Sequence, residues 1–203
     1  MLLSPQAIDR SKPLLFVVGL YPLLRWFYLG WQDNLTVNPT EFLTRSSGIW
    51  TLVCLIATLR VSPLRHWLGV PALIRLRRMF GLFAFFYATL HTLAWAWWEQ
   101  NLVLGDMVMD VWKRPFVTVG MAAFLVMLAM ALTSNQRAMR RLGQWWKVLH
   151  RWVYLVAVLS IVHFWLHKAG KNDFYEVTVY GVIVALLLGW RLWHRFKPET
   201  KTK

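Results

Sequence analysis

Three histidines stand inside long apolar stretches of this sequence: His91, His150 and His163. An ionisable side chain inside a membrane span is expensive and usually has a function. His91 follows Arg78 by thirteen residues, and His163 follows Arg151 by twelve. At a helical rise of ~1.5 Å per residue, both histidines lie about 18–20 Å beyond a charged anchor. Two imidazoles at matched depth are what six-coordinate heme iron needs, and that ligation suits electron transfer better than oxygen chemistry.

His150 predicts a second, inner site. It precedes His163 by thirteen residues, which separates the two by about 20 Å along a helix and turns them about 140° away from a shared face. A bulge or bend between them is therefore expected. The matching inner position, thirteen or fourteen residues before His91, holds Arg78 or Arg77. Neither is a normal heme ligand, so the sequence shows only half of the inner site.

Other interpretations of these polar residues stay open. His163 and His167 share one helix face and suit a metal ion, although no Glu, Asp or Cys nearby completes that site. Arg25, inside the first span, pairs with a heme propionate or snorkels outwards. Arg77 and Arg78 anchor an inner propionate, a flavin or a quinone head group, or serve only as topology charge.

The simplest alternative treats the histidines as structural. A neutral histidine that hydrogen-bonds to a neighbouring helix is common in membrane bundles. His66 in a basic loop and His194 at a helix end are expected to be interfacial polar residues without a special role. The single cysteine, Cys54, lies in an apolar run and excludes a disulfide within the chain.

The elements that must position these histidines are predicted to be membrane-spanning helices. The chain has 203 residues, of which 58% are hydrophobic, and a span needs about 20 mostly apolar residues. The apolar runs are continuous and do not alternate as barrel strands do, so helices are favoured. The sequence predicts an all-α bundle with six spans near residues 13–30, 48–61 (starting as early as 41), 79–98, 115–133, 146–167 and 174–196.

The charge distribution predicts the orientation of the bundle. With a cytoplasmic N-terminus, 17 of the 23 Lys and Arg residues fall in cytoplasmic segments, and seven of the nine acids fall on the other side. Basic residues concentrate on the cytoplasmic side of membrane proteins. Both termini are therefore expected inside. The net charge of +14 is mostly this topology signal, which argues against a nucleic-acid partner.

Two stretches resemble a known family. Residues 77–83 and 87–91 read RRMFGLF and YATLH, and residues 147–154 and 161–165 read KVLHRWVY and IVHFW. They resemble the third and fifth helices of the ferric reductase-like transmembrane superfamily. Together with the length and topology, they most closely resemble its MsrQ (formerly YedZ) family, and the resemblance covers essentially the whole chain as one heme domain, residues 1–203.

The resemblance implies a function. MsrQ-like proteins sit in the inner membrane of Gram-negative bacteria, bind b-type heme and are also assigned FMN. They pass electrons from the quinone pool or a cytosolic flavin reductase to MsrP, a periplasmic molybdopterin enzyme that reduces methionine sulfoxide in oxidised proteins. Carried over, His91, His150 and His163 are heme ligands, for one heme b or for two. The superfamily pattern has a fourth histidine where this chain has Arg77 and Arg78.

Further expectations concern what the chain needs from outside. No phosphate-binding Gly-rich loop or dinucleotide fingerprint is present, so an external electron donor is predicted. Two other classes of function remain. A proton or metal transporter would use the same histidines but would need carboxylates along a polar track. A purely structural membrane subunit would need none of them.

Overall fold

The computed structural model describes residues 4–170 and 172–196, and no strand occurs among them. Lys171, Lys197, Lys201 and Lys203, which entered the predicted charge distribution, lie outside the described residues. The helices are α1 (Pro5–Trp31), α2 (Pro39–Trp67), the 3-10 turn η1 (Pro71–Leu76), α3 (Arg77–Ala94), the π-helical turn η2 (Trp95–Glu99), α4 (Leu104–Lys113), α5 (Pro115–Leu132), α6 (Gln136–Leu142), α7 (Gln144–Arg151), α8 (Val153–Ala169) and α9 (Tyr175–Phe196).

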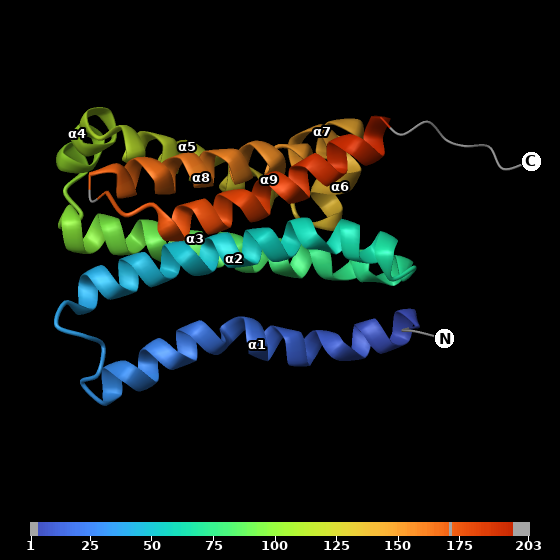
Figure 1. Ribbon diagram of the computed structural model, residues 1–203, viewed down its shortest axis with the longest axis horizontal. Helices are drawn as coiled ribbons and strands as arrows, with labels where there is room; N and C mark the ends of the chain where they lie inside the picture. The colour runs from blue at the N-terminus through green and yellow to red at the C-terminus, as the bar shows by residue number, and fades with distance from the viewer. Residues whose placement is uncertain (1–3, 171, 197–203) are drawn as a thin grey trace, which may run out of the picture.

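Within residues 4–170 and 172–196, six segments are long and apolar enough to cross a membrane, which confirms the predicted number of spans. They are α1, α2, η1 with α3 and η2, α5, α7 with α8, and α9. In Figure 1 these segments run side by side along the long axis of the molecule, with α1 at the edge of the bundle. Many of their large apolar side chains are exposed, such as Leu14 at 67% and Phe27 at 71%. Such surfaces suit contact with lipid.

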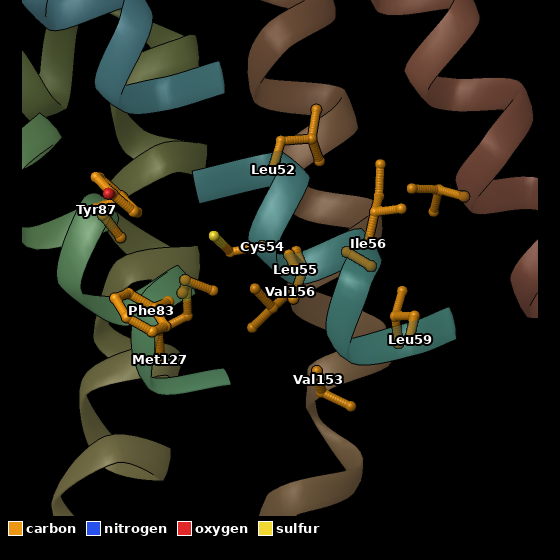
Figure 2. Packing of buried hydrophobic residues seen from close by; sticks show 14 of the residues in the cluster. Leu52, Cys54, Leu55, Ile56, Leu59, Phe83, Tyr87, Met127, Val153 and Val156 are labelled. Atoms are coloured by element: carbon orange, nitrogen blue, oxygen red, sulfur yellow. The ribbon is translucent and has the colours of Figure 1, made fainter. Parts of the chain in front are cut away.

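The interior of the bundle is formed mainly by α2, α3, α5 and α8. Figure 2 shows α2 side chains, including Leu55 and Leu59, in one cluster with Phe83 of α3 and Val156 of α8. Leu59 and Val156 have no exposed surface. This packing fixes α3 and α8, which carry His91 and His163, relative to α2 and α5.

The two ends of the bundle differ. The first residues of α1 and the last of α9 lie at the same end, beside α6 and α7, whereas α4 lies at the opposite end (Figure 1). We call these the α6 end and the α4 end. The α4 helix was not predicted; Met107 and Val111 pack on Trp95 and its neighbours, while the opposite face of α4 leaves Trp112 87% exposed.

Two details of the helices bear on the predictions. The first helix begins at Pro5 with Ser4 as its N-cap, eight residues before the start of the predicted span at residue 13. The polar residues before Pro13 are compatible with a helix that extends beyond the apolar run. The fifth span is interrupted at Trp152, which separates α7 from α8. This interruption lies between His150 and His163, where a bulge or bend was expected.

Candidate functional site

A cavity of about 560 Å³ opens among α2, α3, α5 and α8 in the half of the bundle nearer the α4 end. We call it the first cavity. Its interior is mostly apolar and includes small residues on three helices, Gly48, Ala88 and Gly120. His91 from α3 and His163 from α8 both line it. A largely apolar cavity with a few convergent polar groups is the usual form of a cofactor site.

The two histidine rings in the first cavity lie close together, edge-on to one another. The ring centroids of His91 and His163 lie 6.0 Å apart, and the ring planes are 85° to one another. An imidazole nitrogen lies about 2 Å from a metal ion that it binds. Two imidazoles on opposite sides of one iron therefore have centroids roughly 6 Å apart. The centroid distance thus matches that of two imidazoles that share one iron.

Main-chain carbonyls orient both rings. The Nδ1 atom of His91 lies 2.9 Å from the carbonyl oxygen of Thr44 on α2, and that of His163 lies 2.6 Å from the carbonyl oxygen of Phe116 on α5. A carbonyl only accepts, so Nδ1 of each ring carries the hydrogen and donates it. The lone pair of each neutral ring is then on Nε2, the arrangement typical of metal-bound histidine.

Two glycines make room for the rings, and the sequence analysis missed both. A Cβ added at Gly48 would lie 3.1 Å from Cε1 of His91, and one added at Gly120 would lie 2.6 Å from Nδ1 of His163. Small residues allow close approach in membrane helices. A glycine within an apolar run was the available sequence signal, but only the fold shows which histidine it faces.

His167 also lines the first cavity, one turn beyond His163 on α8. Its ring packs edge-on against Phe116, with centroids 5.3 Å apart. No group of three or more His, Cys, Asp or Glu side chains within residues 4–170 and 172–196 is arranged to hold a metal ion. The alternative metal site built on His163 and His167 therefore gains no further ligand from this part of the chain.

A second cavity, of about 590 Å³, lies in the half of the bundle nearer the α6 end. Four cationic side chains line it, and no carboxylate is among its described lining residues. Such a cavity favours a ligand that carries acidic groups. The four are Arg77, Arg78, Lys147 and Arg151.

His150 lines the second cavity from α7. Its Nδ1 atom lies 3.0 Å from the carbonyl oxygen of Trp146, one turn earlier, and its ring stacks on the Trp146 indole at 4.0 Å. Its Nε2 atom lies 3.4 Å from the hydroxyl of Ser134. No described imidazole faces it across this cavity.

The two cavities lie in series along the bundle. Met127 lines both of them. Phe124 of the first cavity stacks on Phe85 of the second, with centroids 5.9 Å apart and planes at 16°. The cavities are therefore separated by one layer of apolar side chains.

The remaining arginines divide into two groups. Arg77 and Arg78, for which an inner propionate, a flavin or quinone head group, or topology charge alone was expected, both line the second cavity. Arg25 is exposed on α1 and lines neither cavity. Arg191 of α9, which the sequence analysis did not single out, donates to the hydroxyls of Tyr154 and, at 2.6 Å, Ser62. It adds a further positive charge behind Tyr154 in the wall of the second cavity.

The histidines outside the cavities form their own contact. The rings of His66 and His194, at the α6 end, lie 4.6 Å apart, and both contact Trp190. Neither histidine lines a cavity. This position agrees with the interfacial role expected for them.

Comparison with known proteins identifies the class. The family model described as "Ferric reductase like transmembrane component" matches residues 44–161, so the chain is a ferric reductase-like multi-pass membrane protein. A Bordetella parapertussis protein, named "Protein-methionine-sulfoxide reductase heme-binding subunit MsrQ", is 60% identical over 95% of each chain. Its Ralstonia nicotianae namesake is 49% identical over 95% of this chain and 89% of its own. The chain belongs to the MsrQ family. No solved structure matches it.

Proposed function

We propose that the chain is a membrane heme protein that passes electrons across the bacterial inner membrane to a periplasmic methionine sulfoxide reductase. The observation that carries this proposal is the close pair His91 and His163, with centroids 6.0 Å apart inside an apolar cavity. The names of the relatives, which call them heme-binding subunits, support it. Heme bound between two imidazoles supplies one-electron redox chemistry without an open iron position.

The residues of the first cavity would act by holding and orienting. The carbonyls of Thr44 and Phe116 keep the Nε2 lone pairs of the two histidines available. The apolar walls, with Phe124 and Met127, exclude water from the cofactor. The chain itself would need little rearrangement, because His91 and His163 are already held in place by these carbonyls.

The second cavity supports a heme count of two. His150 provides one imidazole there. The four cationic side chains of this cavity are suited to pair with the two propionate groups of a heme. Only one layer of side chains, with Met127 and the stacked Phe85 and Phe124, separates the two sites. Two redox centres in series would carry an electron from one end of the bundle to the other.

The proposed orientation places the α6 end in the cytoplasm. That end carries the cationic second cavity, and basic residues favour the cytoplasmic side. Both termini would then be cytoplasmic, and the first cavity would face the periplasm. The electron acceptor would be an MsrP-like molybdopterin reductase, and the donor a cytosolic flavin reductase or the quinone pool. FMN stays a prediction from the family resemblance; Arg77 and Arg78, expected to anchor an inner propionate, a flavin or a quinone head group, both line the second cavity.

The transporter alternative finds less support in the described spans. Their carboxylates lie near helix ends, at Asp9, Glu41, Glu99 and Glu176. The last three line the first cavity, but no carboxylate is among the described lining residues of the second, so no carboxylate track crosses the described part of the bundle. The decisive experiment is a reduced-minus-oxidised absorbance spectrum of the purified chain, where we expect a b-type heme band. A chain that folds but shows no such band would exclude the proposed function. Electron delivery is then tested in vesicles, with an MsrP-like enzyme on one side and a reduced flavin donor on the other.

A further inference from the structure

The first cavity contains a repeated local arrangement. The acceptor carbonyls of Thr44 and Phe116 lie 47 residues before His91 and His163, respectively. In both cases the glycine that the ring touches follows the acceptor by four residues (48 − 44 and 120 − 116). The α2–α3 pair and the α5–α8 pair therefore present their histidines in the same way, with a shift of 72 residues (163 − 91).

The same shift relates two residues of the second cavity. His150 lies thirteen residues before His163, and Arg78 lies thirteen residues before His91. Both Arg78 and His150 line the second cavity. One half of the molecule thus places an imidazole there, and the other half places a guanidinium at the corresponding position.

A guanidinium cannot replace the missing imidazole as a ligand. Arginine stays protonated in proteins and has no acceptor lone pair. The other α3 residues that line the second cavity carry no ligand group either. They are Arg77, Gly81, Leu82, Ala84 and Phe85. The α3 wall of this cavity is therefore unable to bind iron.

Thioether and phenol groups can also bind heme iron, and those among the described lining residues, on Met127, Met130, Met139 and Tyr154, all come from helices other than α3. Met130 of α5 lines the second cavity. The Ser134 hydroxyl lies 2.7 Å from the Met130 carbonyl oxygen and 3.4 Å from Nε2 of His150. Met130 therefore belongs to the wall that contacts His150, not to the α3 wall.

We propose that the second cavity holds its heme through His150 as the only protein ligand, which leaves the iron position on the α3 side open to small ligands beside Arg78. This inference rests on the proposed function and extends it. The two sites of one chain would then differ in kind. The first would be closed by two imidazoles, and the second would be accessible and would have a cationic hydrogen-bond donor beside it.

Carbon monoxide binding to the dithionite-reduced chain tests the proposal, with total heme measured separately as heme per chain. Carbon monoxide binds reduced heme that has an open axial position. In the wild type we expect about half of the heme to show a carbon monoxide difference spectrum. His150→Ala should remove that half and leave the remainder unable to bind carbon monoxide.

Arg78→His is the sharper variant, because it places an imidazole where the repeat has one. We expect heme per chain to be retained and carbon monoxide binding to fall at least about tenfold as the iron becomes six-coordinate. Arg78→Lys keeps the charge without an imidazole and should still bind carbon monoxide. Met130→Leu should behave as the wild type.

The outcomes separate the two claims. A folded chain with no heme at all contradicts the proposed function itself. Two hemes per chain without carbon monoxide binding, or a single heme that binds none, overturns the inference while the proposed function stands. Carbon monoxide binding that survives His150→Ala unchanged, or that first appears in Met130→Leu, also overturns it.

Discussion

Gly120 and His163 are in closer contact than any side chain at position 120 would allow. A Cβ at Gly120 would lie 2.6 Å from Nδ1 and 2.8 Å from Cε1 of the ring. The His163 ring cannot move away without losing its hydrogen bond to the carbonyl of Phe116. The contact at Gly48 is looser, with the His91 ring 3.1 Å from an added Cβ.

Gly120→Ala is therefore expected to impair heme binding more than Gly48→Ala. Overpacking of a filled site costs about 1–3 kcal/mol, which corresponds to an affinity loss of about 5- to 150-fold. Heme titration of the apo-protein measures it. Gly189→Ala is the matched control, because nothing lies within 4 Å of an added Cβ there. Equal affinities for all three variants would contradict the close contact.

His91→Ala and His163→Ala are each expected to remove most of the heme from the first cavity, because either change leaves one axial position without a ligand. His150→Ala should have a smaller or separate effect. Heme per chain and the reduced spectrum distinguish these cases. His66→Ala is the control, since His66 lines neither cavity. Equal and complete loss from all three cavity variants would show that the cavities do not act as separate sites.

The helices and the histidine pair were predictable to different degrees. Continuous apolar runs predicted six spans, and matched depth brought His91 and His163 to one level of the bundle. Their partners were not predictable, because the carbonyls of Thr44 and Phe116 are main-chain atoms that every residue possesses. Arg191 was missed for another reason: its hydroxyl partners, including Ser62, lie far away in the chain.

Tyr87→Phe should destabilise the contact between α1 and α3 without affecting the first cavity. The Tyr87 side chain is fully buried, and its hydroxyl donates to the carbonyl of Gly19 at 2.5 Å. Loss of one such bond typically lowers the free energy of unfolding by about 0.5–1.5 kcal/mol. Denaturation in detergent checks this. Tyr21→Phe is the control, because Tyr21 is exposed. A change in the heme spectrum of Tyr87→Phe would contradict the expectation that this hydrogen bond does not affect the first cavity.

Acidification is expected to loosen the connection between α8 and α9. The hydrogen bond from Lys168 holds the pKa of the Asp173 carboxyl below its ordinary value of 3.8. A carboxyl with a lowered folded-state pKa stabilises the fold above its ordinary pKa, and this stabilisation is lost as the pH falls through the lowered value. We therefore expect no change from this group between about pH 5 and 8 and a loss below about pH 4.

Hydrogen exchange of residues 168–176 measures this effect at pH 7 and at low pH. Asp173→Asn should raise exchange in this segment already at pH 7 and should reduce its dependence on acid. Asp106→Asn, at the same end of the bundle, provides a control for general changes in surface charge. Identical exchange in Asp173→Asn and the wild type at pH 7 would show that the ion pair with Lys168 does not hold the segment.

The two carbonyls that orient the histidines have a consequence for natural variation. Thr44 and Phe116 contribute through their main-chain oxygens, so evolution can exchange the side chains at these positions without removing the acceptor. An alanine scan would pass over both residues and score them as dispensable. Inserting or deleting one residue in the first turns of α2 or α5 would instead rotate the acceptor away by about 100°. The site is thus tolerant of substitution at these positions but sensitive to any change in helix length.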